Sequence, residues 1–138
     1  MATRLKLASA AQDVPGRRDP RHALGSAAEC AAAEVLELAG LQVLLRNWRR
    51  RRGELDIVAR DGDVLVVAEV RVRNHAEFGS AAASVDFIKQ KKIIRTTQQL
   101  LQQQPALAKL RVRFDVIEAK HHAGAFELNW IKYAFSAG

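Results

Sequence analysis

The sequence predicts an α/β fold, with a central mixed sheet of about five strands flanked by helices. Segments rich in Ala and Leu, which favour helix, are interspersed with short apolar runs rich in Val and Ile, which favour strands. Their order along the chain is helix, three strands, helix, two strands. The 138 residues are enough for one domain with one hydrophobic core.

Local signals place each element. A first helix is expected over residues 23–39, followed by Gly40, a natural helix stop. A strand over residues 41–48 leads into an Arg-rich turn. Strands over residues 54–59 and 64–73 are joined by Asp61-Gly62, a strong two-residue hairpin signal. The remaining elements are a helix over residues 81–104, ended before Pro105, and strands over residues 110–119 and 125–135.

Residues 1–22 are expected to form a disordered tail, and residues 23–138 the single folded domain. Pro15, Gly16 and Pro20 interrupt any helix in the tail. No apolar stretch is long enough for a membrane-spanning helix. The single Cys30 excludes an internal disulfide and fits a reducing compartment. We therefore expect a cytoplasmic protein that does not bind membranes.

The chain is basic, with 22 Lys and Arg against 15 Asp and Glu, a formal charge of +7 and a pI near 10.2. Such an excess favours a polyanionic partner such as nucleic acid. Composition alone equally allows a basic surface with no special role.

Acidic residues interrupt the predicted hairpin of residues 53–73, which otherwise reads as core. With a two-residue turn, Glu54 lies directly opposite Glu69, and Asp56 lies diagonal to Glu69 at roughly 7–8 Å. These three acids and Arg71 then share one face of the sheet. Buried like charges are costly unless a cation neutralises them, and Mg²⁺ would do so. Pairing with nearby Arg side chains, or a register slip of one residue, are the alternatives.

Basic residues cluster just before the acidic strand. The cluster consists of Arg46, Arg49, Arg50, Arg51 and Arg52. Arg forms bidentate hydrogen bonds with phosphate, so this run is a candidate nucleic-acid contact. In the second predicted helix, Lys89 and Lys92 share one face and could line the same groove. A solvated turn and a solvated helix face are the alternatives.

Four segments, in order, match the pattern of a known family: "GSAAECAAAEVLELAGLQVLLRNWR", "GELDIVARDGDVLVVAEVRVR", "FGSAAASVDFIKQKK" and "RFDVIEA". On these segments the chain resembles the YraN-like, UPF0102-type family of uncharacterised bacterial proteins. That family is grouped with the PD-(D/E)XK nuclease superfamily and is similar to Holliday junction resolvases. The resemblance covers about residues 25–135 and implies a restriction-endonuclease-like domain.

The resemblance also implies roles for individual residues. Glu29 matches the acid of the first helix. Asp56 matches the Asp of the first strand motif, with Leu55 in place of the namesake Pro, and Glu69 matches the acid of the E-x-K motif. In such sites the acids, here Asp56 and Glu69, hold Mg²⁺ or Mn²⁺, which activates water for attack on a phosphodiester. Glu54 is expected to support these ligands without binding the metal.

The chain departs from the family pattern at Arg71, which stands where the E-x-K motif has its lysine. Arg can stabilise phosphate charge in a transition state, but it cannot act as a base because it does not lose its proton. Lys89 matches a family position on the following helix and could supply the missing ammonium.

The sequence therefore predicts a nucleic-acid-binding, metal-dependent endonuclease-like protein that hydrolyses DNA, including branched DNA. Glu29, Asp56, Glu69 and Arg71 are its candidate catalytic residues. The candidate phosphate contacts are Arg46, Arg49, Arg50, Arg51, Arg52, Arg73, Lys89 and Lys92. The alternatives are a non-catalytic nucleic-acid-binding module on the same fold, which Arg71 favours, and an interaction scaffold with incidental charge. Resolvase-like action needs two active sites, so the analogy implies a homodimer.

Overall fold

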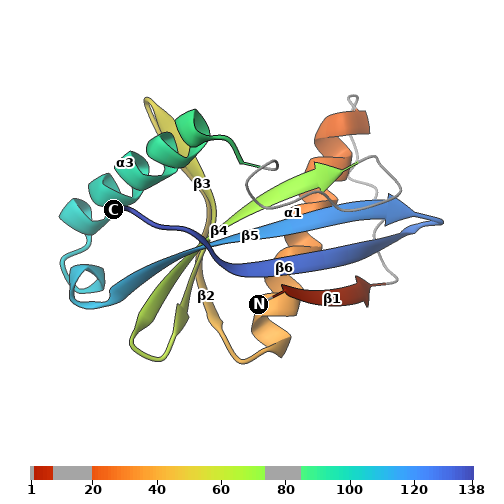
Figure 1. The fold of residues 1–138 in the computed structure, drawn as a ribbon, viewed down its shortest axis with the longest axis horizontal. Coiled ribbons are helices and arrows are strands. Elements are labelled where there is room, and N and C mark those ends of the chain that lie inside the picture. Colours follow the sequence, from red (N-terminus) through yellow and green to blue (C-terminus); the bar gives the residue numbers. More distant parts are fainter. Residues whose placement is uncertain (1, 8–19, 74–84) are drawn as a thin grey trace.

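The computed structural model describes residues 2–7, 20–73 and 85–138, which form an α/β domain (Figure 1). Its elements are β1 (Ala2–Leu7), α1 (Pro20–Leu38), β2 (Gln42–Arg50), β3 (Gly53–Asp61), β4 (Val64–Arg73), α3 (Phe87–Gln103), the 3-10 helix η1 (Leu107–Lys109), β5 (Arg111–His122) and β6 (Ala125–Phe135). The predicted fold class is confirmed. No helix in the described part of the chain is long and apolar enough to cross a membrane.

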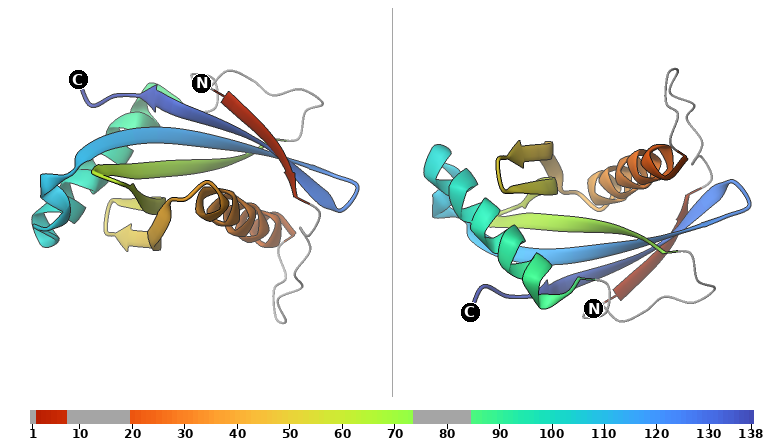
Figure 2. Two further views of the ribbon diagram at one scale, coloured as in Figure 1. Left: turned by 90° about the horizontal axis from the view of Figure 1, so that it is seen from below. Right: turned by 90° about the horizontal axis from the view of Figure 1, so that it is seen from above.

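The strands form one mixed sheet in the order β1-β6-β5-β4-β3-β2. Neighbouring strands are antiparallel except β4 and β5, which are parallel and joined through α3. A parallel pair needs such a crossover connection, whereas the antiparallel pairs need only short turns. Helices α1 and α3 lie on opposite faces of the sheet (Figure 2).

Each helix covers its own hydrophobic core. The α1-side core joins small residues of the helix to the sheet, and its members include Ala28, Ala31, Ala32, Leu36, Ile57, Ala59, Val66, Ala68, Ile117 and Trp130. The α3-side core is built from larger side chains, including Leu55, Val58, Leu65, Val67, Ile93, Leu100, Phe114 and Val116. Because the centres of β3 and β4 are buried on both faces, residues 57–59 and 64–68 form continuous apolar runs.

The prediction of a disordered tail over residues 1–22 is wrong for its two ends. Residues Ala2–Leu7 form β1, which pairs antiparallel with β6 as an edge strand and adds a sixth strand to the predicted five. Helix α1 begins at Pro20 rather than near residue 23, because proline is tolerated in the first turn of a helix. Residues 8–19 of the predicted tail, and residues 81–84 of the predicted second helix, lie outside the described residues.

The β3–β4 turn lies one residue later than predicted, at Gly62 and Asp63, and Gly62 has a left-handed φ of +62°. As a result, Val67 pairs with Val58 rather than with Asp56. The pairing is offset by two residues, and the faces of a strand repeat every two residues. The error therefore leaves the predicted face of each β4 residue unchanged.

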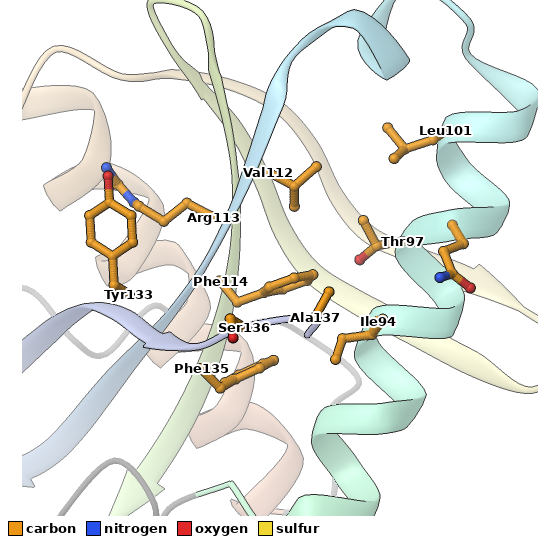
Figure 3. A pocket seen from close by; sticks show the side chains of 11 residues that line it. Ile94, Thr97, Leu101, Val112, Arg113, Phe114, Tyr133, Phe135, Ser136 and Ala137 are labelled. Atoms are coloured by element: carbon orange, nitrogen blue, oxygen red, sulfur yellow. The ribbon is translucent and has the colours of Figure 1, made fainter.

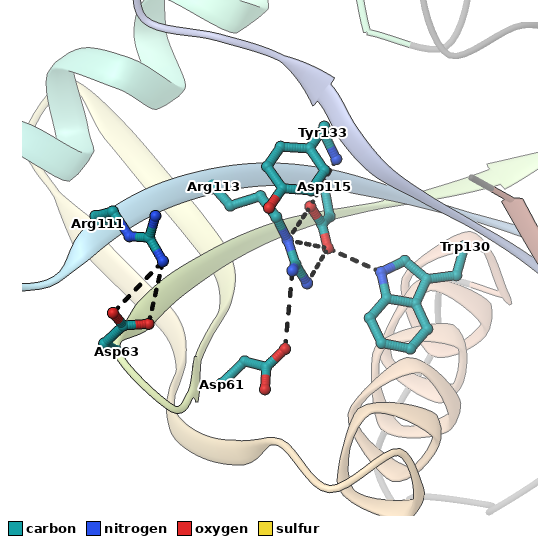
Figure 4. A network of polar contacts seen from close by, with 7 residues as sticks. All are labelled: Asp61, Asp63, Arg111, Arg113, Asp115, Trp130 and Tyr133. Carbon is teal, nitrogen blue, oxygen red and sulfur yellow. Dashed lines mark hydrogen bonds and ion pairs between the residues drawn. The ribbon is translucent and has the colours of Figure 1, made fainter.

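The buried carboxylate of Asp115 links the first half of β5 to the second half of β6 (Figure 4). Asp115 of β5 is fully buried and accepts hydrogen bonds from Arg113 Nε at 2.9 Å, Trp130 Nε1 at 2.9 Å and the Tyr133 backbone N–H at 3.1 Å. Tyr133 has a φ of +55°, and the β5–β6 register shifts beside Asp115. The carboxylate thus satisfies the backbone donor that this irregularity takes out of the ladder.

Replacement of Asp115 by alanine should destabilise the fold by about 3–5 kcal/mol, because it leaves the buried Arg113 guanidinium with only the longer ion pair to Asp61, at 3.8 Å. Asp63→Ala is the matched control, since Asp63 also pairs with an arginine of β5, at 3.3 Å, but its side chain is 77% exposed. That change should cost less than about 1 kcal/mol. Urea denaturation of both variants measures the difference, and equal losses would contradict this account of the network.

Candidate active site

Strands β2 and β3 both change face at one point, and the candidate site forms there. Leu55 belongs to the α3-side core and Ile57 to the α1-side core, although residues two apart in a regular strand share a face. The β2–β3 ladder omits the pair formed by Asn47 and Asp56 at this point, and Asn47 has a φ of +52°. We call this paired irregularity the Asn47–Asp56 kink.

The kink brings the Asp56 carboxylate to the edge where β3 and β4 separate. The β3–β4 ladder stops at Ile57 and Ala68, one residue short of Asp56. Asp56 Oδ2 accepts a hydrogen bond from the Val70 N–H at 2.9 Å, in place of a ladder carbonyl. The Asp56 and Glu69 carboxyl groups lie close enough for a hydrogen bond from protonated Glu69 to lower the pKa of Asp56 and raise the pKa of Glu69. The structure therefore brings these two acids together at this edge, as expected from the sequence.

Helix α3 supplies a cation to this pair. Lys89 Nζ lies 3.5 Å from Glu69 Oε2, and the Glu69 side chain is only 5% exposed. Asp86 caps the helix by accepting the Lys89 N–H at 2.8 Å, which fixes the first turn and with it the direction of the lysine. The predicted proximity of Lys89 to the site is thus found.

Glu54 does not share the face of Glu69, and this corrects the prediction. It lies on the α1 side and pairs with Arg49 at 3.0 Å, because the kink turns the start of β3 over. Glu54 and Glu29 line one polar cavity of about 450 Å³ between α1 and the β2–β3 hairpin. The other residues that line it are His22, Gly25, Ser26, Asn47 and Arg49.

Burial and mutual repulsion shift the acids toward their neutral forms. Burial raises the pKa of Glu69 from 4.5 to about 8, the Asp56 charge adds to the rise, and Lys89 opposes it. Burial raises the pKa of Glu29 from 4.5 to about 7, and Asp56 again adds to the rise. Burial also raises the pKa of Asp56, against the Val70 hydrogen bond that lowers it. The three carboxyl groups therefore form one electrostatically linked cluster.

The donor set fits a divalent cation that completes its coordination with water and substrate. Among the described residues, no group of three or more His, Cys, Asp or Glu is arranged to hold a metal ion on its own. Asp56 and Glu69 do supply two adjacent carboxylates whose combined negative charge is unfavourable without a cation. Mg²⁺ typically takes one or two protein carboxylates and keeps its remaining positions for water and phosphate oxygens.

The arginines of the run that is predicted to contact nucleic acid fall into two groups. Arg51 and Arg52 form the exposed turn between β2 and β3, and neither has a hydrogen bond or ion pair with another described residue. The other three are engaged: Arg46 donates to Cys30 Sγ at 3.3 Å, Arg49 pairs with Glu54, and the Arg50 guanidinium lies 3.7 Å from the centre of the Trp48 ring. Of this arginine run, the two side chains at the tip of the hairpin are therefore the most available to bind a ligand.

Two further arginines lie on β4. Arg71 is half-buried, and its charge lowers the pKa of Glu69. Arg73 pairs with the fully buried Glu118 at 3.0 Å, so its charge serves to neutralise an internal carboxylate. The predicted contact of Arg73 with nucleic acid stays a prediction. Lys92 is exposed on α3, one turn beyond Lys89.

A second pocket lies away from the acids (Figure 3). It has a volume of about 180 Å³ and is formed where the end of β6 and the residues after it face α3. Its lining is largely apolar and includes Ile94, Leu101, Val112, Phe114 and Phe135. None of the candidate catalytic residues lines it.

Sequence reasoning missed Asn47 as a site residue. Its only signal was an Asn inside an otherwise regular strand pattern, in "LLRNWR". Asn tolerates a left-handed backbone better than most residues, so such a position predicts an irregularity in the strand. The pairing of Asn47 with Asp56 across the hairpin could not be recognised without the register of β2 against β3.

Comparisons with known proteins bear on the identity of the chain. The model of "Uncharacterised protein family UPF0102" matches residues 28–119, a range that includes all three carboxylates of the cluster. The chain belongs to uncharacterised protein family UPF0102. This confirms the predicted family, whereas its grouping with PD-(D/E)XK nucleases stays a prediction.

Relatives in UPF0102 match along most of their length. A UPF0102 protein of Xanthomonas campestris pv. campestris (strain B100) is 48% identical over 122 residues, covering 88% of this chain and 96% of that protein. A UPF0102 protein of Pseudomonas syringae pv. syringae (strain B728a) is 44% identical over 122 residues, covering 88% of this chain and 99% of that protein. The family assignment therefore applies to the domain as a whole.

The raised pKa values predict how stability changes with pH. The folded chain holds protons that the unfolded chain has released, on Glu69 between about pH 4.5 and 8 and on Glu29 between about pH 4.5 and 7. The free energy of unfolding contributed by these groups therefore falls as the pH rises through this window. Glu69→Gln removes one such group, so its thermal midpoint should rise relative to the parent as the pH increases from 5 to 9.

Glu37→Gln is the matched control, because Glu37 is exposed on α1. Its midpoint should differ from the parent by the same amount at every pH. Thermal denaturation followed by circular dichroism supplies the values. If the Glu69→Gln difference were also constant with pH, the buried acid cluster would not be the source of the linkage.

Proposed function

We propose that this chain is a metal-dependent nuclease that hydrolyses phosphodiester bonds of DNA. The observation that carries the proposal is the buried Asp56–Glu69 carboxyl pair, with Lys89 at 3.5 Å from Glu69. A fold gains nothing by burying two acids side by side, since the charged forms repel and are poorly solvated. Such pairs with shifted pKa values are concentrated at functional sites.

Asp56 and Glu69 would hold Mg²⁺ or Mn²⁺ in the proposed site. When bound, the ion activates water and stabilises the leaving oxygen of a phosphodiester. Glu29 faces the polar cavity beside them, and its pKa of about 7 suits it to accept a proton from water near neutral pH. Lys89 and Arg71 contribute positive charge next to Glu69, where a phosphate would gather negative charge.

The position of Lys89 bears on the missing lysine of the E-x-K motif. Arg71 occupies that position in the sequence and cannot deprotonate. Lys89 reaches the same carboxylate, Glu69, from α3 with a compact ammonium group. We therefore assign to Lys89 the role of the motif lysine, with Arg71 as an additional phosphate contact.

The β2–β3 hairpin supplies the proposed contact with the DNA backbone. Its tip carries Arg51 and Arg52, both exposed. The hairpin starts β3 only three residues before Asp56, so a strand bound at the tip lies next to the acids. Arg forms bidentate hydrogen bonds with phosphate and supplies the sequence-independent part of binding.

Cleavage of labelled DNA tests the proposal. We expect the parent to cut a four-way junction, a matched duplex or a single strand in Mg²⁺ or Mn²⁺, and not in EDTA. Asp56→Asn and Glu69→Gln should each lower the rate at least about 100-fold, because each removes one of the two proposed metal ligands. Glu37→Gln, an exposed acid of α1, should cut like the parent.

The same assay distinguishes the roles of the cations and the rival function. Lys89→Ala should lower the rate about 10-fold or more, and an unchanged rate would remove Lys89 from the site. If the parent cut none of the substrates with either metal, yet bound DNA tightly, the chain would be a binding module without catalysis. The lysine-to-arginine change at Arg71 is the observation that favours this second candidate.

Binding measured against salt concentration tests the hairpin. Each phosphate contact contributes about 0.9 to the slope of log K against log salt for duplex DNA. The double change Arg51→Ala and Arg52→Ala should therefore reduce that slope by about 1–2. Arg111→Ala is the matched control, because Arg111 is also exposed but pairs with Asp63 at the opposite end of β3. An equal reduction from the control would contradict a specific role for the hairpin tip.

A further inference from the structure

Asn47 occupies an unusual backbone position at the centre of the cluster. It lies within β2 and yet has a φ of +52°, in the left-handed region. It stands across from Asp56, at the one point where the β2–β3 ladder omits a pair on both strands. A left-handed residue inside a strand is strained unless its surroundings hold it there, and such strain is concentrated at functional sites.

The Asn47 side chain reaches the acid of the neighbouring helix. It lines the polar cavity beside Glu29, and hydrogen bonding from its amide acts on the pKa of Glu29 in the direction that lowers it. A carboxylate can only accept hydrogen bonds, so the donor is the Asn47 Nδ2–H group. Glu29 also lies in the field of Asp56 and Glu54, which repel its charged form. Asn47 thus stabilises the charged form of Glu29, which the negative charges of Asp56 and Glu54 destabilise.

We infer that Asn47 is a positioning residue that sets the places of two carboxylates of the acid cluster, Asp56 and Glu29. Its left-handed backbone forms the kink that delivers Asp56 to the separation of β3 and β4. Its side-chain amide orients Glu29 in the polar cavity between α1 and the β2–β3 hairpin. This inference rests on the proposed nuclease function for its effect on rate, but the coupling between Asn47 and Glu29 is measurable without catalysis.

The choice of asparagine follows from both requirements. Among residues with a side chain, Asn, Asp and His are enriched in the left-handed region. Asp carries no N–H donor for Glu29, and its charge would add a further acid to the cluster. Gly adopts the backbone readily but has no side chain to orient the carboxylate. Asparagine combines the backbone conformation with a neutral donor.

Two substitutions test the side-chain role while they keep the left-handed backbone. Asn47→Gly keeps the left-handed conformation, and Asn47→Asp keeps the shape of the side chain, while both remove the N–H donor. We expect both variants to fold, to lower kcat for DNA cleavage in Mn²⁺ about 10-fold or more, and to change KM less than about 2-fold. Gln42→Ala, an exposed residue at the start of the same strand, should leave both constants unchanged.

A double-mutant cycle with Glu29→Gln makes the test independent of catalysis. If Asn47 acts through Glu29, the thermal midpoints of Asn47→Gly, Glu29→Gln and the double variant should combine non-additively, by about 2 °C or more. A folded Asn47→Gly or Asn47→Asp variant that keeps the parent kcat would overturn the inference. If the parent cuts no DNA, the proposed function fails, and the cycle alone decides: additive midpoints would overturn the role of Asn47.

Discussion

The burial of two carboxyl groups at the Asn47–Asp56 kink is the constraint on which the rest of the site depends. Asp56 reaches this position only because β3 leaves its ladder with β4, and the lost backbone pairing is replaced by the 2.9 Å hydrogen bond from Val70. The same kink moves Glu54 to the α1 side and Leu55 into the α3-side core. One local irregularity therefore sets the position of the acids and the packing around them.

Helix α3 is held where it partly offsets this burial. Helix α3 directs Lys89 at Glu69 from its capped first turn, and Gly53 allows the helix to approach the start of β3. A Cβ at Gly53 would lie only 2.1 Å from Thr96 Oγ1, so this close approach depends on glycine. Helix α1 contributes Glu29 from the opposite face. The acid cluster is thus assembled from both layers of the fold, and the sheet alone could not complete it.

The sequence predicts the elements well and the irregularities poorly. Apolar periodicity and turn residues locate α1, α3 and five strands, because each signal is local. The convergence of Asp56 and Glu69 survives a register error of two residues, since strand faces repeat with that period. The face of Glu54 is lost because the kink depends on Asn47 and Asp56 meeting across two strands. Strand β1 is missed because its pairing partner, β6, lies at the other end of the chain.

The cost of the acid cluster distinguishes the two proposed functions on physical grounds. A module that only binds DNA needs positive charge at its surface, and acids beside the phosphate path would weaken that binding. Here three carboxyl groups with raised pKa values lie a few residues from the Arg51 and Arg52 turn. A nuclease uses such acids, because a divalent cation bound between them reverses the local charge and draws the phosphate in. The arrangement is costly for binding and useful for hydrolysis, which is why hydrolysis is the function proposed first.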